Sequence, residues 1–240
     1  ISYEVGQNIN TSQNSVLTNG LVGLWSFNGP DMAGVTAYDR SGQGNHGTLT
    51  NGPVRAIGKI GQGLRFDGTD DYVNAGTSNF AGDGAVSESM WVKFFQSESG
   101  SSYHIMTDLN RTTDLVFYFD DTSGTELIKF GHRNSGGNHG VQWDVSSAYA
   151  SQWKNKWKHF VVVYDGGATD SATSYSFYVD GVLYTTGKAS SLIGGSTSSN
   201  IIGYDSVPVG GYLNGLVDEV RIYNRALTAA EVKLLYNSGK

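Results

Sequence analysis

The sequence predicts an all-β protein, a sandwich or barrel of short strands that is followed by one C-terminal helix. From Leu21 onward, short apolar or alternating runs are separated at regular intervals by Gly, Asn, Asp and Ser. Glycine makes up 33 of the 240 residues, about twice its usual share, which is typical of a turn-rich chain. Helical periodicity is found in the segment ALTAAEVKLLYNSGK at the C-terminus.

Individual segments support this prediction. YSFYVDGVLYTT predicts two alternating strands joined by a two-residue turn at Asp180-Gly181. HFVVVY is apolar on both faces and predicts a central strand. In the helix, Thr228 and Glu231 form a capping box, and the helix is expected to pack against an edge of the sandwich. Residues 1–20 are polar and predict a linker or a loosely attached edge strand, so the domain is expected to span 21–240.

The composition argues against several classes of function. The net charge of −6 leaves no basic stripe that could displace the counterions of a nucleic acid. No apolar run approaches the roughly 18 residues of a membrane span, so membrane insertion is not expected. The absence of cysteine excludes disulfides and thiolate metal sites. The low share of charged residues, 16%, and the many glycines suit a protein exposed outside the cell.

The segment AYDRSGQGNHGTLTNG contains the spacing Gly42-x-Gly44-x-x-Gly47, which matches a dinucleotide-binding fingerprint. Such a loop requires a helix that opens at its last glycine, so that free N–H groups face the phosphates. Here TLTNGP follows, with β-branched residues and a new turn, so the nucleotide interpretation fails.

A buried carboxylate is expected in the last strand, LNGLVDEVRIYNRAL. Strict alternation would place Asp218 on one face with Leu216, Val220 and Ile222, so its charge needs a partner or a metal. Oxygen atoms of Asp39 and Asn45 could complete a calcium site, because calcium takes 6–8 oxygen ligands. The alternative is structural. Asp39 and Ser41 would then cap a turn, and Asp218 would accept backbone N–H bonds or pair with Arg40 or Arg65.

A second acidic group, Asp67, Asp70 and Asp71, lies at a predicted hairpin in RFDGTDDYV, where turn chemistry around Gly68 is the favoured interpretation. Catalytic motifs such as G-x-S-x-G and H-E-x-x-H are absent from the sequence. Alternation also points Asp218 and Glu219 to opposite faces, so they cannot act together on a glycosidic bond. An enzyme is therefore not indicated, although a carboxylate pair assembled from distant strands stays open.

The segment VQWDVSSAYASQWKNKW and the polar loops around it favour a binding surface. Aromatic rings that stack on sugars, together with polar groups that bond to hydroxyls, would form such a site. The candidates are Trp143, Trp153, Tyr149, Tyr103 and Arg133. The alternative is that Trp143 and Trp153 are ordinary edge packing.

Several motifs occur in an order that resembles a known family. They are GLVGLWSFNG, DRSGQGNHGTLTNGP, GKIGQGLRFDGTDDYVNAG, SESMWVKF, KWKHFVVVYDGG, YSFYVDGVLYTTG and LNGLVDEVRIYNRALTAAEVKLLY. Over residues 20–240 the chain is similar to laminin-G-like, concanavalin-A-like jelly-roll domains of bacterial surface or secreted proteins. The resemblance implies two antiparallel sheets packed face to face and a structural calcium ion near the first and last strands. Of the residues named above, it favours Asp39, Asn45 and Asp218 as calcium ligands.

The resemblance leaves three classes of function. The first is a non-catalytic, lectin-like module that binds a polysaccharide or another glycan, as a monomeric part of a larger extracellular or cell-surface protein. The second is an adhesion or spacer domain that recognises a protein surface, or nothing soluble. The third is a glycan hydrolase or lyase, which needs facing carboxylates in a cleft.

Overall fold

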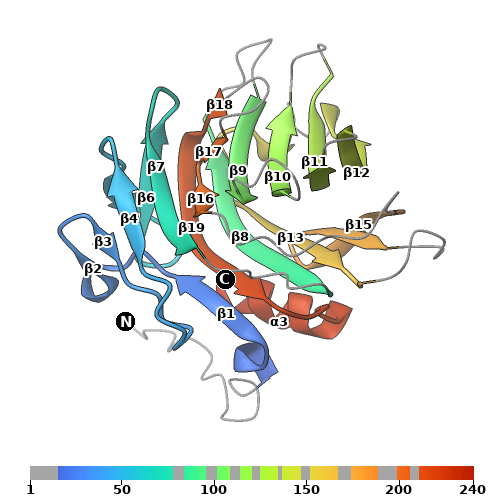
Figure 1. Cartoon of the computed structure of the whole chain (residues 1–240), viewed down its shortest axis with the longest axis horizontal. Coiled ribbons are helices and arrows are strands. Elements are labelled where there is room, and N and C mark those ends of the chain that lie inside the picture. The colour runs from blue at the N-terminus through green and yellow to red at the C-terminus, as the bar shows by residue number, and fades with distance from the viewer. Residues whose placement is uncertain are drawn as a thin grey trace, which may run out of the picture.

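The computed structural model describes residues 16–77, 84–95, 102–108, 114–120, 125–134, 137–146, 152–166, 174–188, 199–205 and 211–240. These residues form two antiparallel sheets packed face to face, with a helix outside one of them (Figure 1). The prediction of an all-β, two-sheet antiparallel sandwich with a short C-terminal helix is confirmed. No helix in the described part of the chain is long and apolar enough to cross a membrane.

The first sheet has eight strands in the order β15-β14-β13-β8-β19-β6-β5, and β1 also pairs with β19. Its strands are β1 (Leu21–Trp25), β5 (Val54–Ile57), β6 (Gln62–Asp67), β8 (Val86–Phe94), β13 (Lys158–Tyr164), β14 (Tyr175–Val179), β15 (Val182–Gly187) and β19 (Asn214–Tyr223). The segment HFVVVY lies in β13, between β8 and β14, which confirms it as a central strand. The turn between β14 and β15 is formed by Asp180 and Gly181, both with positive φ, as the sequence predicts.

The second sheet has nine strands in the order β12-β11-β10-β9-β16-β7-β4-β3-β2. Its strands are β2 (Met32–Ala33), β3 (Thr36–Ala37), β4 (Gly47–Thr50), β7 (Tyr72–Thr77), β9 (Ser102–Asp108), β10 (Asp114–Asp120), β11 (Leu127–Asn134), β12 (Gly137–Asp144) and β16 (Ser199–Ile202). A separate two-stranded hairpin is formed by β17 (Tyr204–Asp205) and β18 (Gly211–Tyr212). A short 3₁₀ helix, η1 (Gly29–Asp31), precedes β2.

An aromatic core fills the space between the sheets. Phe117 contacts Phe160 and Phe177 edge to face, and Trp143 stacks on Phe177 with a ring separation of 5.1 Å. Large flat rings of this kind bury much apolar area with few rotatable bonds, so they dominate the packing free energy of such a layer.

Strand β19 contains a bulge that changes which side chains share a face. Residues 214–217 pair with β6, residues 220–223 with β1, and the register with β8 shifts between Asp218 and Arg221. Glu219 there has a φ of 53°, in the left-handed region. Val217, Val220 and Ile222 therefore belong to the inner core, so the expectation that Asp218 shares a face with Val220 and Ile222 is wrong.

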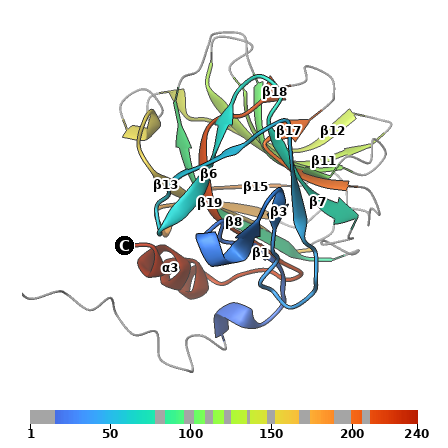
Figure 2. The same cartoon turned by 90° about the vertical axis from the view of Figure 1, so that its left-hand side faces the viewer.

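Helix α3 (Ala229–Ser238) begins with the predicted capping box, in which Thr228 and Glu231 bond to each other's backbone N–H groups. Its residues Val232 and Leu235 pack with Val161, Val163 and other residues into a second cluster. These partners lie on the central strands of the first sheet, so α3 covers the outer face of that sheet rather than an edge (Figure 2). Leu17 belongs to the same cluster, so the described end of the 1–20 segment packs onto this layer.

Candidate binding site at the rim of the sandwich

A tight acidic turn joins β6 to β7. The Asp67 side chain accepts a hydrogen bond from the Thr69 N–H at 2.7 Å, and Gly68 has a φ of 83°, which favours glycine. The Asp71 side chain reaches back and accepts a hydrogen bond from the Asp67 N–H at 3.0 Å. The sequence-based interpretation as turn chemistry is therefore correct for the backbone.

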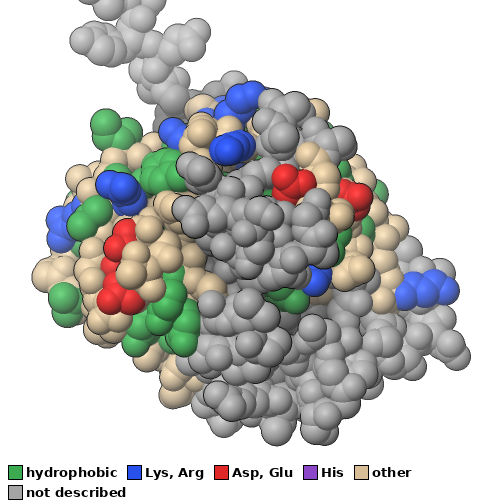
Figure 3. All heavy atoms as spheres, turned by 90° about the horizontal axis from the view of Figure 1, so that it is seen from above, with side chains coloured by type: hydrophobic (Ala, Val, Ile, Leu, Met, Phe, Trp, Pro, Cys, Tyr) green, Lys and Arg blue, Asp and Glu red, His purple; other side chains and the backbone are tan. Residues whose placement is uncertain are grey.

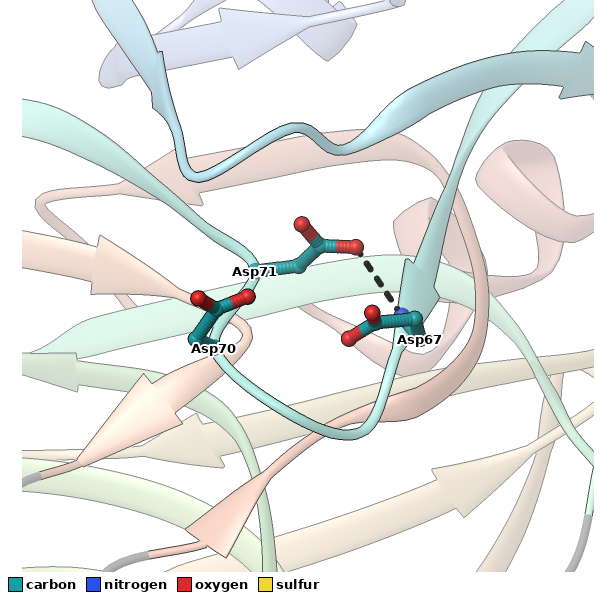
Figure 4. A group of neighbouring side chains, drawn as sticks. All are labelled: Asp67, Asp70 and Asp71. Carbon is teal, nitrogen blue, oxygen red and sulfur yellow. Dashed lines mark hydrogen bonds between the residues drawn. The ribbon is translucent and has the colours of Figure 1, made fainter.

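The same turn gathers three carboxylates. Oxygen atoms of Asp67, Asp70 and Asp71 lie within 4.8 Å of one another, with Asp71 buried and the other two exposed (Figure 4). Burial raises the pKa of Asp71, and the charges of Asp67 and Asp70 raise it further, against the hydrogen bond from the Asp67 N–H. A site with three carboxylates so close together fits a divalent cation with oxygen ligands, such as calcium.

Three tyrosines adjoin this turn. Tyr204 and Tyr212 are directly paired across the β17–β18 hairpin, and their rings stack with centroids 4.2 Å apart and planes 11° apart. The ring of Tyr72, at the start of β7, lies 5.7 Å from that of Tyr204 at a tilt of 36°. All three side chains are partly exposed, which makes them a surface group rather than core.

The backbone before the hairpin is fixed by one glycine. Gly203 has a φ of 94°, and a Cβ at this position would lie 2.7 Å from the Phe66 ring, so a larger residue would be strained and would overlap the core. The Leu213 N–H bonds to the Gly203 carbonyl at 2.9 Å, which closes the hairpin. These constraints hold Tyr204 beside Tyr72.

Electrostatics link the tyrosines to the acidic turn. The pKa of Tyr212 is raised by desolvation first, then by its contact with the Tyr204 side chain, and then by the Asp70 charge. The β6–β7 turn and the β17–β18 hairpin both lie at the upper end of the sandwich in Figure 1. Seen from above, that end carries acidic side chains beside hydrophobic ones (Figure 3). We call Asp67, Asp70, Asp71, Tyr72, Tyr204 and Tyr212 the rim group.

The residues expected to bind calcium lie elsewhere and have other partners. The Asp39 carboxylate accepts four hydrogen bonds, from the N–H groups of Leu24, Ser41 and Asn45 and from the Ser41 hydroxyl. Four donors occupy the lone pairs that a metal would need, so Asp39 organises its loop. The Asn45 side-chain amide donates to the Val22 carbonyl at 2.8 Å. These contacts match the structural alternative that the sequence left open for Asp39.

Asp218 lies in the gap of β19 between its pairings with β6 and β1, and it is fully buried. Its Oδ2 accepts hydrogen bonds from the N–H groups of Lys59 and Ile60, each at 2.8 Å, while Oδ1 is buried with no hydrogen-bond partner among the described residues. Burial raises the pKa of this carboxyl to about 7, against the two N–H groups, with a further rise from the Glu219 charge. Within the described part of the chain, neither Asp39 nor Asp218 belongs to a group of three acidic or histidine ligands.

The tryptophans expected to bind sugar are buried. Trp153 is 2% exposed and Trp143 is 9% exposed, and both belong to the core between the sheets. An indole that packs on Phe177 or Phe160 has no open face for a sugar, which favours the packing alternative for this pair. Tyr103 and Arg133 lie on strands β9 and β11, but their side chains, like the whole of Tyr149, are outside the described residues.

Sequence reasoning missed the tyrosines of the rim group. Tyr72 directly follows Asp70 and Asp71, which is a local signal, but Tyr204 and Tyr212 are more than a hundred residues away. Tyr204 contacts Tyr72 because β16, which precedes Tyr204, pairs with β7, and Tyr212 stacks on Tyr204. Only the strand order of the sheet places them together.

A family model described as the concanavalin A-like lectin/glucanase superfamily matches residues 67–233. No curated protein sequence matches the chain. Among solved structures, the chain is similar to domain 4 of AbnA, a GH43 extracellular arabinanase from Geobacillus stearothermophilus, in complex with arabinotriose. The identity is 21% and the TM-score 0.66, over 90% of this chain and 98% of that domain.

The chain is also similar to the binding domain of botulinum neurotoxin DC. The complex with rat synaptotagmin II has 15% identity and a TM-score of 0.71, and the complex with SialylT has 16% identity and a TM-score of 0.70. In both cases the match covers 93% of this chain and 52% of that domain, so the chain spans about half the length of these toxin domains. At these identities the likeness establishes the fold.

Proposed function

Because the chain belongs to the concanavalin A-like lectin/glucanase superfamily, we propose that it is a non-catalytic carbohydrate-binding module of an extracellular bacterial protein. The observation that carries the proposal is the rim group, in which partly exposed tyrosines adjoin exposed carboxylates. Aromatic rings and a few placed polar groups are the side chains that fix a sugar's orientation in a binding site.

The structural neighbours support a binding role. The arabinanase domain was solved with arabinotriose, and the toxin domain with SialylT and with rat synaptotagmin II. These ligands belong to those proteins, and for this chain they motivate a glycan screen.

The proposal includes a structural calcium ion, held by the acidic turn rather than by Asp39, Asn45 and Asp218. Asp67 and Asp71 each accept one backbone hydrogen bond in the described structure, and a hard cation bound by the three carboxylates would relieve their mutual repulsion. The ion would tie the two arms of the β6–β7 turn together and thereby hold Tyr72 in place.

Retention in native gels that contain plant, algal or microbial polysaccharides tests the binding function. Each gel is run once with calcium and once with a chelator. We expect the protein to be slowed by at least one glycan. If the protein is shown to be folded and no polysaccharide slows its migration, the glycan-binding function is refuted. The adhesion or spacer alternative is then favoured.

A further inference from the structure

We propose that the rim group selects neutral glycans with adjacent hydroxyl groups and rejects acidic ones. This inference rests on the proposed function and names the ligand class of the same site. It is carried by the three tyrosines, whose rings form a partly exposed surface, and the carboxylates beside them set the preference for charge.

The tyrosines have unequal roles. Tyr204 is the middle ring, because it stacks on Tyr212 and also contacts Tyr72. Contact with a sugar therefore falls mainly to the outer rings, Tyr72 and Tyr212. The C–H groups on one face of a pyranose or furanose are apolar and slightly positive, so they pack well on the negative face of a phenol ring. Tyr204 supports both rings from within the group.

The carboxylates favour neutral hydroxyls. Asp67 and Asp70 are exposed, and an ionised carboxylate accepts hydrogen bonds but donates none. Adjacent sugar hydroxyls can donate to oxygens of these two carboxylates that a bound cation leaves free, whereas a uronate or sialate group would bring a like charge. Asp70 lies two positions before Tyr72, whose ring contacts that of Tyr204, so acceptor and rings lie in one site.

The preference does not depend on whether calcium is bound. Three carboxylates carry three negative charges, and one Ca²⁺ leaves one negative charge on the turn. The whole chain carries a net charge of −6, which acts in the same direction over longer distances. Discrimination against acidic polymers is therefore expected with the ion and without it.

The test compares native affinity gels that contain neutral polymers (arabinan, galactomannan and mixed-linkage β-glucan) with gels that contain polygalacturonate or alginate. We expect the wild type to be retarded by at least one neutral polymer and by neither acidic polymer. Tyr72→Ala and Tyr212→Ala should each weaken the retention about tenfold. Tyr72→Phe, which keeps the ring, should stay within about threefold of the wild type. Asp70→Asn should weaken neutral retention and increase acidic retention.

Two variants serve as matched controls. Tyr184→Ala removes a tyrosine that is 43% exposed on β15, and Asp144→Asn removes an exposed carboxylate on β12, so neither should change retention. Near-UV circular dichroism and a cooperative unfolding transition verify that each variant is folded. Neutral retention that survives Tyr72→Ala and Tyr212→Ala, or equal retention by acidic polymers, overturns this inference and leaves the glycan-binding function intact. No retention of the wild type on any polymer refutes both.

Discussion

The carboxyl group of Asp218 is buried at the point of β19 that lies between its pairing with β6 and its pairing with β1. Its Oδ2 accepts hydrogen bonds from the Lys59 and Ile60 N–H groups, which lie in the connection between β5 and β6, so it fixes the backbone of that connection. Removing a charged group from water costs free energy, which is why its pKa is raised to about 7 from an ordinary value of 3.8.

This shift predicts that the protein loses stability as the pH rises. The native state holds the Asp218 proton up to about pH 7, whereas the unfolded chain releases it near pH 4. The free energy of unfolding should therefore fall between about pH 4 and pH 7, by up to about 4 kcal/mol from this group alone. Asp218→Asn keeps an acceptor for the two N–H groups and carries no charge, so urea unfolding should show a flatter pH profile.

Asp144→Asn is the matched control for the titration. Asp144 is exposed, and hydrogen bonds from Ser146 lower its pKa, so it stays ionised through this pH range. Its variant should keep the wild-type slope. A slope that is the same in Asp218→Asn and in the wild type would show that the burial of Asp218 does not control the pH dependence.

At the scale of secondary structure, the turn between β14 and β15 packs against helix α3. Gly181 has a φ of 76°, and a Cβ there would lie 2.9 Å from the Tyr236 Cβ on α3. Tyr236 in turn stacks on Trp91 of β8, with ring centroids 5.7 Å apart. A change in this turn should therefore be felt in the helix and in the sheet below it.

Gly181→Ala should destabilise the protein by about 1–3 kcal/mol, because it adds both backbone strain and a steric overlap. Gly34→Ala separates the two effects, since Gly34 has a φ of 57° but no atom of the described residues lies within 4 Å of a Cβ at this position. Chemical denaturation measures the free energy of unfolding of both variants, and Gly181→Ala should lose more of it than Gly34→Ala. Equal losses of stability in the two variants would show that α3 moves to accommodate the new Cβ and that the steric overlap with Tyr236 does not affect stability.

The sequence predicted elements whose signals are local. The Asp180-Gly181 turn, the Thr228–Glu231 cap and the apolar strand HFVVVY each depend on residues within a dozen positions, and all three are confirmed. Which side chains of β19 face the core was not predictable, because the bulge at Glu219 lies where the partner of β19 changes from β6 to β1. Alternation rules hold only where pairing is continuous.

For the whole molecule, the limit of sequence reasoning was the candidate site. Trp143 and Trp153 stand in a polar stretch that suggests exposure, yet the sheets close over both rings. The rim group combines residues from β7 and from the β17–β18 hairpin, and these meet only through the order of the second sheet. Composition and motifs indicate a family and a fold, whereas the site depends on pairing between distant segments.

The charge of the molecule leads to a prediction for calcium. Three carboxylates of one turn repel one another in a chain whose net charge is already −6, so a divalent cation that binds the folded turn stabilises the native state. The melting temperature should rise by roughly 5–10 °C when free calcium is about one hundred times its dissociation constant. Differential scanning calorimetry in calcium and in chelator measures this rise.

Two variants decide which carboxylates are responsible. Asp70→Asn should abolish the rise and, without calcium, should melt no lower than the wild type, because it removes one of the repelling charges. Asp39→Asn should lower the melting temperature, since its carboxylate holds a loop through four hydrogen bonds, but should keep the calcium response. A response lost in Asp39→Asn and kept in Asp70→Asn would instead assign the ion to the loop near the first strand. Because the measured quantity is the difference between calcium and chelator, a variant that is merely less stable still reports where the ion binds.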